Sequence, residues 1–226
     1  MSSGFMRLVR RRREKQGNCM TTGTSVDPER LAEALYRAGA IQFGAFRLKL
    51  HEERPDAPLS PLYINLRLLR SYPDQMDVAV ETYRALVSAC TFDVLADVPL
   101  AATPFVAILS HQTRIPMITP RQPKTHGSGA SIDGAFAAGQ AAVVIDDLVT
   151  KADSKLEAVR VLEGEGLRVR DVVVLVDREQ GGRQQLAAAG YTLHAAVTLS
   201  ELLEIYRRSG RMDEAAYQRV HAYREG

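Results

Sequence analysis

The stretch AAVVIDDLVTKADSK, residues 141–155, decides the expected fold. Its first five residues are apolar and predict a buried strand, Asp146 and Asp147 follow directly, and a helical pattern begins near Ser154. In open α/β sheets, ligands bind at the carboxyl ends of the strands, and the N-terminus of a following helix offers free N–H groups to a phosphate. The stretch therefore predicts a ligand site, although a strand end and a helix cap would explain the same residues.

The composition is that of a globular protein with one large α/β domain. The chain has 226 residues, of which 46% are hydrophobic and 25% are charged. Its apolar runs are all shorter than the ~20 residues that a membrane span needs, so we expect no membrane partner. Cys19 and Cys90 are too few and too far apart for a disulfide framework or a metal site, which favours a cytoplasmic location.

The positive charge is concentrated near the N-terminus. Six basic residues and one acidic residue fall between Arg7 and Lys15, so the net charge of +2 becomes −3 for the remainder of the chain. Residues 1–26 show no sustained periodicity and are interpreted as a disordered basic extension, with a targeting signal or a nucleic-acid contact as the alternative. The rest of the chain has no basic cluster, and we expect no nucleic-acid partner.

Residues 27–226 are predicted to form a single domain, with a hood at 27–70 and a core at 71–226. Strands alternate with helices in the core, which predicts an α/β fold with a mainly parallel central sheet and helices on both faces. A helix is expected from Asp27, an N-cap followed by proline, to Ala38. The expected strands cover 41–50, 61–66, 93–96, 115–119, 141–145, 172–176 and 193–197. The other expected helices cover 74–89, 104–111, 154–163, 184–189, 201–209 and 213–224, and a loop is expected over 120–134.

Five other segments extend the pattern of residues 143–155. They are GAIQFGAFRLK (39–49), SPLYINLR (60–67), FDVLADVPLAATP (92–104), IPMITPRQPKTHG (115–127) and VVVLVDREQGG (172–182). In this order, the segments resemble the orotate phosphoribosyltransferases among the type I phosphoribosyltransferases, over roughly residues 27–224. The resemblance implies a type I phosphoribosyltransferase fold with an N-terminal hood, a pyrophosphate loop at 92–104 and a mobile catalytic loop at 115–127.

The family transfers phosphoribosyl from phosphoribosyl pyrophosphate to orotate, which gives orotidine 5′-monophosphate and pyrophosphate in pyrimidine (UMP) biosynthesis. Such a reaction passes through a state with positive charge on the ribose and growing negative charge on the leaving group. The resemblance implies that Asp146 and Asp147 hold the ribose hydroxyls and stabilise the positive ring. It also implies Mg²⁺, bound mainly through substrate oxygens, because a hard cation beside phosphates needs few protein ligands.

Two segments are expected to bind the phosphates. The first comprises Thr150, Lys151, Ala152, Asp153 and Ser154. Its backbone N–H groups and hydroxyls are expected to surround the 5′-phosphate. In the catalytic loop, Arg121 and Lys124 supply positive charge and His126 is the expected proton donor to pyrophosphate, with a solvated basic loop as the alternative. In this family the loop reaches the neighbouring subunit's site, so the resemblance implies a homodimer.

The orotate site is expected beside the end of the strand at 172–176. Arg178 follows this strand, and its guanidinium is suited to bind a carboxylate through two hydrogen bonds. Lys49 is carried over as a substrate-binding lysine of the hood, and Tyr63 and Ile64 as residues that lie against the flat base. A surface arginine in a turn, a solvent-facing lysine and simple core packing are the respective alternatives.

Four positions depart from the family pattern. Ala152 and Asp153 stand where small residues, usually with a glycine, let the backbone approach phosphate. Asp97 stands where the pyrophosphate loop usually has glycine, and Gln122 where a second loop lysine is common. We expect these changes to weaken phosphate binding.

Two alternatives therefore stay open: a non-catalytic or regulatory homologue that binds a phosphoribosyl compound or nucleotide, and a phosphoribosyltransferase for another base. An orotidine 5′-monophosphate decarboxylase is a candidate partner.

Overall fold

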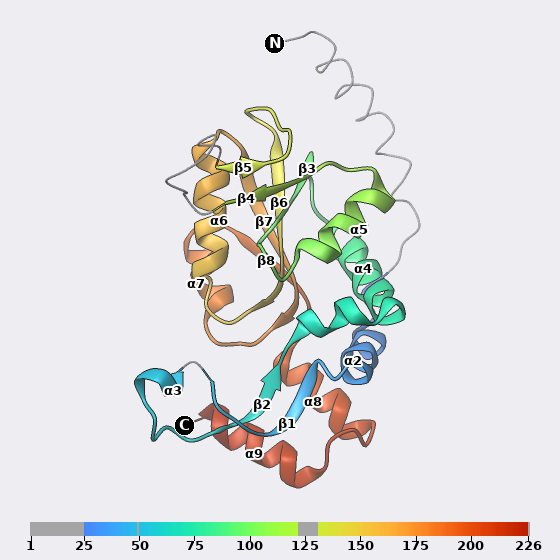
Figure 1. Ribbon diagram of the computed structural model, residues 1–226, viewed down its shortest axis with the longest axis vertical. Helices are drawn as coiled ribbons and strands as arrows, with labels where there is room; N and C mark the ends of the chain where they lie inside the picture. Colours follow the sequence, from blue (N-terminus) through green and yellow to red (C-terminus); the bar gives the residue numbers. More distant parts are fainter. Residues whose placement is uncertain (1–24, 49, 122–130, 226) are drawn as a thin grey trace.

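A six-stranded sheet forms the centre of the molecule (Figure 1). The computed structural model describes residues 25–48, 50–121 and 131–225, so the predicted basic extension lies almost entirely outside the described residues. The strands follow the order β5-β4-β3-β6-β7-β8 and are all parallel except β5, which runs antiparallel to β4. They are β3 (Val94–Asp97), β4 (Met117–Pro120), β5 (Ile132–Asp133), β6 (Ala141–Val149), β7 (Arg168–Asp177) and β8 (Thr192–Thr198). The predicted α/β fold class is confirmed.

Helices cover both faces of this sheet, because alternate residues of a buried strand point to opposite sides. In β6, Val143 and Ile145 join one hydrophobic cluster, whereas Ala142 and Val144 join another. The sheet helices are α4 (Pro73–Val87) and α5 (Thr103–Thr113) on the first side, and α6 (Asp153–Gly164) and α7 (Gly182–Ala188) on the second (Figure 1). None of the helices in the described part of the chain is long and apolar enough to cross a membrane.

A two-stranded antiparallel sheet lies at one end of the molecule, outside the central sheet (Figure 1). Its strands and flanking elements are β1 (Ile41–Phe46), α3 (Leu50–Glu53), β2 (Ser60–Ile64) and the 3₁₀ helix η1 (Leu66–Ser71). Three more helices lie at this end: α2 (Pro28–Arg37), α8 (Leu199–Arg208) and α9 (Glu214–Glu225). The Asp27 side chain accepts the N–H of Arg30 at 3.0 Å, which confirms the predicted cap of α2. Helix α9 packs against β2, so the C-terminus of the chain supports the segment that the sequence analysis assigned to the hood.

Several predicted boundaries differ from the structure. The strand predicted over 41–50 ends at Phe46, because Phe46 pairs with Ser60, the first residue of its partner strand. The strand predicted over 141–145 continues to Val149, since β7 pairs with this extension as well. In the loop predicted over 120–134, residues 122–130 lie outside the described part, but Ile132–Asp133 form β5, a strand too short to show any periodicity.

Candidate active site

The carboxylates of Asp146 and Asp147 lie in a cleft at the carboxyl-terminal edge of the central sheet. The cleft has a volume of about 320 Å³. Its lining residues come from the end of β2 and the start of η1, the segment after β3, the end of β6 and the start of α6: Ile64, Asn65, Leu66, Arg67, Val98, Pro99, Ala101, Asp146, Asp147, Leu148, Ser154 and Lys155. The structure thus brings the acidic pair, the hood and a helix N-terminus to one place.

Asp146 forms a buried ion pair. Lys155 Nζ lies 2.6 Å from Asp146 Oδ2, and each side chain is only 6% exposed. The other carboxylate oxygen, Asp146 Oδ1, accepts the N–H of Asp147 at 2.8 Å. The buried hydroxyl of Tyr83 donates to the carbonyl oxygen of Asp146 at 2.8 Å, so α4 also holds this end of β6.

Lys155 was not predicted as a site residue, although the sequence contains a signal for it. Lys155 precedes Val159 by four residues and Leu162 by seven, and all three are buried in α6. This spacing places the lysine on the apolar face of the helix. A lysine at such a position needs a partner, because burying an unpaired charge is costly.

The surroundings of Asp147 favour its protonated form. Burial, followed by the charge of Asp146, raises the pKa of Asp147 to about 7 from the usual value of 3.8. The N–H of Leu148 donates to Asp147 Oδ1 at 2.8 Å, which favours the ionised form but does not cancel the effect of burial. Asp147 can therefore gain or lose a proton near neutral pH, and a positive charge brought into the cleft would favour its ionised form.

Between β6 and α6, the residues that depart from the family pattern fit the conformation of the backbone. Ala152 is fully buried with φ −90° and ψ 4°, a conformation that does not require glycine, and its N–H donates to Gln185 Oε1 at 2.8 Å. Asp153 is exposed at the first position of α6, where the helix dipole favours an acidic side chain. Lys151 and Ser154 are also exposed, so both remain accessible from solvent.

Gly182 fixes this segment against the turn after β7, and its role was not predicted. The N–H of Gly182 donates to the carbonyl oxygen of Thr150 at 2.9 Å. A Cβ atom at this position would meet Val149 Cγ2 at 2.4 Å and the Thr150 carbonyl oxygen at 2.7 Å. Only glycine allows the two backbones to approach this closely.

Asp97 does not reach the cleft. Its side chain is fully buried at the end of β3 and accepts hydrogen bonds from the hydroxyls of Thr103 and Thr119. The expectation that Asp97 places a negative group near the pyrophosphate is therefore wrong. The carboxylate instead joins β3 to α5 and β4, while the next residues, Val98 and Pro99, line the cleft.

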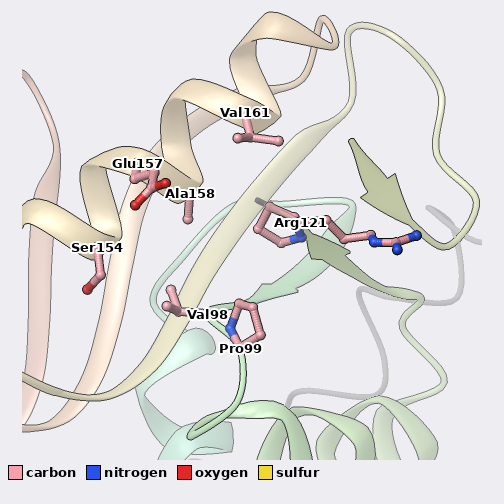
Figure 2. Close-up of a pocket in the computed structure, with 8 residues that line it drawn as sticks. Val98, Pro99, Arg121, Ser154, Glu157, Ala158 and Val161 are labelled. Carbon is pink, nitrogen blue, oxygen red and sulfur yellow. The ribbon is translucent and has the colours of Figure 1, made fainter. Parts of the chain in front are cut away.

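The side chain of Arg121 is turned away from α6. The residue borders a small pocket of about 90 Å³ beside α6 (Figure 2). Its guanidinium points away from α6 and forms an ion pair with Asp133 of β5 at 3.0 Å (Figure 2). Arg121 is therefore already paired with an acidic side chain of β5. The other predicted loop residues, Lys124 and His126, lie outside the described part of the chain, as does Lys49 of the hood.

The described residues predicted to bind the base occupy three different positions. Ile64 lines the cleft, whereas Tyr63 packs against Phe46 with ring centroids 5.6 Å apart. Arg178 lies at the same sheet edge as the acidic pair, since its N–H donates to the carbonyl oxygen of Val149 at 2.9 Å. Its Nε atom is buried and has no hydrogen-bond partner among the described residues, and burial lowers the pKa of the guanidinium.

The amino-acid sequence of this chain is similar to those of several known proteins. The bifunctional enzyme PyrF/PyrE of Nostoc sp. is 34% identical over 81% of this chain, and uridine 5′-monophosphate synthase of Bos taurus is 37% identical over 85%. The chain spans only 37% and 40% of the lengths of these two relatives. Orotate phosphoribosyltransferase of Pyrobaculum aerophilum is 34% identical over 78% of this chain and 90% of its own length. No protein-family model matches the chain.

The solved structures agree with the sequence relatives. UMP synthase of Leishmania donovani superposes with a TM-score of 0.76 and 35% identity, covering 86% of this chain and 41% of that one. Orotate phosphoribosyltransferase of Aeropyrum pernix superposes with a TM-score of 0.69 and 26% identity, covering 81% and 99%. A mainly parallel sheet with helices on both faces, as in these structures, is the fold of a type I phosphoribosyltransferase, and in this chain paired carboxylates precede a helix N-terminus. The chain belongs to the orotate phosphoribosyltransferase family.

Proposed function

We propose that this chain transfers phosphoribosyl from phosphoribosyl pyrophosphate to orotate, giving orotidine 5′-monophosphate and pyrophosphate in pyrimidine biosynthesis. The observation that supports this most is the position of Asp146 and Asp147, which lie in one cleft with the N-terminus of α6. Carboxylates placed beside a phosphate site suit a ribose 5-phosphate, whose hydroxyls need acceptors and whose phosphate needs donors.

The two carboxylates would act differently on the ribose. Asp146 is neutralised by Lys155, so it is an oriented hydrogen-bond acceptor with little net charge. Asp147 forms no ion pair with any residue that the structure describes, and its pKa of about 7 reflects its burial first and the charge of Asp146 second. Positive charge that develops on the ribose ring would favour the ionised form of Asp147 and would be stabilised by it.

The 5′-phosphate would lie at the start of α6. The first N–H groups of a helix have no acceptor within the helix, and the N-cap residue Ala152 offers no side-chain acceptor to them, although its own N–H is bound by Gln185. The hydroxyls of Thr150 and Ser154 and the ammonium group of Lys151 belong to the same segment. A dianionic phosphate would therefore meet backbone donors, hydroxyl donors and a positive charge together.

The cleft also fits Mg²⁺ held mainly through substrate oxygens. Its side chains offer carboxylate and hydroxyl oxygens, which suit a hard cation, and no thiol or imidazole is among the described residues that line it. When bound to ribose and pyrophosphate oxygens, Mg²⁺ would neutralise the leaving group. Asp146 and Asp147 are the carboxylates nearest to where those ribose oxygens would lie.

Arg178 is the proposed partner of the orotate carboxylate. A buried guanidinium nitrogen without an acceptor is unfavourable, and a ligand carboxylate would supply one. Because purine bases have no carboxylate, this residue favours orotate over a purine as the base. The same residue would make the fit specific for a planar acid, since guanidinium and carboxylate can bind through two parallel hydrogen bonds.

The test is an assay of the purified chain with orotate, phosphoribosyl pyrophosphate and Mg²⁺, in which the loss of orotate absorbance is followed. We expect turnover, its loss in Asp146→Asn/Asp147→Asn, and its retention in Asp77→Asn, which changes an exposed acid on α4.

A second candidate is a non-catalytic protein that binds phosphoribosyl compounds, because Lys155 and Gln185 already satisfy groups of the site. Tight calorimetric binding of phosphoribosyl pyrophosphate without turnover would favour this candidate, and no binding would contradict both.

We further propose that the protein acts as a homodimer and that an orotidine 5′-monophosphate decarboxylase consumes its product. The support is the family, together with two relatives that are longer than this chain and of which it matches one part. Light scattering of the purified chain tests the first point, and a monomeric mass at micromolar concentration would contradict it. Co-purification with the decarboxylase tests the second point.

A further inference from the structure

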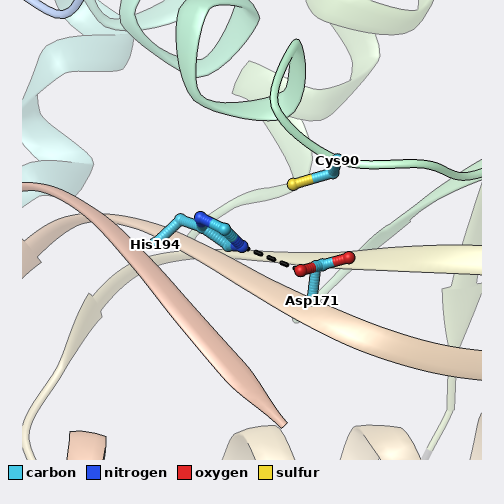
Figure 3. Close-up of side chains that lie close together, drawn as sticks. All are labelled: Cys90, Asp171 and His194. Atoms are coloured by element: carbon cyan, nitrogen blue, oxygen red, sulfur yellow. Dashed lines mark hydrogen bonds and ion pairs between the residues drawn. The ribbon is translucent and has the colours of Figure 1, made fainter.

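Three potential metal ligands lie close together (Figure 3). Two of them are in the amino-terminal halves of β7 and β8, whereas the proposed active site lies at the carboxyl-terminal edge of the sheet. Asp171 lies on β7 and His194 on the adjacent strand β8, where His194 pairs with Val173. Since residues two apart on a strand share a face, Asp171 and His194 project to the same side. Cys90, in the segment after α4, lies over this side of the sheet (Figure 3).

The three side chains are close enough to share one ion. One ligand atom from each lies within 4.8 Å of the others, and His194 Nε2 is 2.8 Å from Asp171 Oδ1. A tetrahedral zinc site has metal–ligand distances of roughly 2.0–2.3 Å, so its ligand atoms lie about 3.3–3.8 Å apart. To reach this geometry, side-chain rotation would have to move the Cys90 sulfur by about 1 Å and the ligand atoms of the other two residues by less.

We propose that Cys90, Asp171 and His194 form a binding site for Zn²⁺. A thiolate, an imidazole and a carboxylate together match the preference of this borderline-soft ion, whereas Mg²⁺ and Ca²⁺ prefer oxygen ligands alone. From their number alone, the cysteines predicted no metal site. The tertiary structure supplies the other two ligands from residues 81 and 104 positions further along the chain.

The surroundings leave room for a fourth ligand. A cavity of about 520 Å³ adjoins the cluster and is lined by Asp171 and His194, as well as by Ala89 and Thr91 on either side of Cys90. Three protein ligands with an open position are typical of zinc sites that keep a water molecule. The ion would tie the segment after α4 to β7 and β8, so its binding would raise the stability of the core.

Asp171 and His194 also form an ion pair that needs no metal, and this is the competing explanation. The two explanations differ in what they require of Cys90. An ion pair between Asp171 and His194 does not depend on the Cys90 thiol, whereas a zinc site loses one of its three protein ligands when the sulfur is removed. The exposed Arg168 and Arg170 at the cavity disfavour a cation only weakly, because solvent screens their charge.

The experiment is a titration of the full, chelator-treated chain with Co²⁺ and Zn²⁺. We expect visible bands of tetrahedral Co²⁺ and a near-ultraviolet thiolate-to-metal band, both displaced by one equivalent of Zn²⁺. Cys90→Ser should remove the thiolate band and weaken binding by more than about 100-fold, and His194→Asn should weaken it similarly, since even the loss of a residue that only hydrogen-bonds a metal ligand costs about 10–100-fold. Cys19→Ser, which removes the only other thiol, should change neither.

Stability and activity provide independent readouts. At about 100 times its dissociation constant, Zn²⁺ should raise the melting temperature of the unaltered chain by about 5–10 °C, with no such rise in Cys90→Ser. Orotate turnover by Cys90→Ser should stay unchanged, because the residue lies far from the cleft. Absence of the thiolate band in the unaltered chain would overturn the proposal, whatever the variants do, and so would equal Zn²⁺ affinity of Cys90→Ser. Both results are separable from a failure of the orotate assay.

Discussion

Replacing Lys155 with methionine is expected to destabilise the protein by about 3–5 kcal/mol at pH 8, the usual cost of removing one member of a buried ion pair. Methionine is unbranched like lysine and one atom shorter, and it removes the charge, so Asp146 is left 6% exposed without a cation. For a chain of this size, each kcal/mol lowers the melting temperature by about 2–4 °C, which gives a loss of about 6–20 °C.

The loss should depend on pH in a defined direction. An unpaired buried carboxyl favours its neutral form, so the folded variant retains a proton that the unfolded chain, with an ordinary aspartate, releases near pH 4. The folded state then binds more protons than the unfolded state above that pH, and stability falls as pH rises. We therefore expect a smaller deficit at pH 5 than at pH 8.

The assay is thermal and urea unfolding of four proteins at both pH values: the unaltered chain, Lys155→Met, Asp146→Asn and the double variant. The double variant should be no less stable than the worse single variant, which corresponds to a coupling energy of about 2–3 kcal/mol. Lys151→Met, which changes an exposed lysine of the adjacent segment, should change stability by less than about 0.5 kcal/mol. Additive single effects, or a Lys155→Met variant as stable as the parent at pH 8, would refute the ion-pair reasoning.

Three other predictions concern the site and its support. Burial raises the pKa of Asp147 to about 7, so the folded state takes up a proton between pH 4 and pH 7 and stability falls as pH rises through this range. Asp147→Asn should therefore gain about 2–4 kcal/mol in urea unfolding at pH 8 while losing turnover, and a pH-independent gain would contradict this cause. Arg178→Lys should raise the KM for orotate at least tenfold and leave that for phosphoribosyl pyrophosphate unchanged, whereas equal changes in both would speak against a carboxylate contact. Gly182→Ala should cost about 1–3 kcal/mol because its Cβ would lie 2.4 Å from Val149 Cγ2, whereas Gly164→Ala, with open space around it, should not destabilise α6.

Much of the architecture was predictable because it depends on neighbours in the chain. The run at 172–176 and the run at 141–145 were identified as strands from their apolar character, and Asp27 with Pro28 marked the start of α2. The ends of strands were less predictable. Phe46 ends β1 and Val149 ends β6 because of what lies opposite them, and a partner strand is invisible in local periodicity.

The same distinction holds for the proposed active site. Asp146 and Asp147 were identified from adjacency and from their place after an apolar run, which are local properties. Lys155 was overlooked because a lysine in a helix is usually exposed, and only packing shows that it meets Asp146. Asp97 was expected to face an anion, but Thr119, 22 residues away, binds its carboxylate in the interior.

The sequence by itself determined the order of strands and helices, the acidic pair and the resemblance to a family, because each of these depends on the type and spacing of residues close together in the chain. Only the tertiary structure decided which charges are neutralised. Lys155 with Asp146, and Cys90 with Asp171 and His194, are brought together by sheet pairing and helix packing, and the burial of Asp147 that follows from this packing raises its pKa.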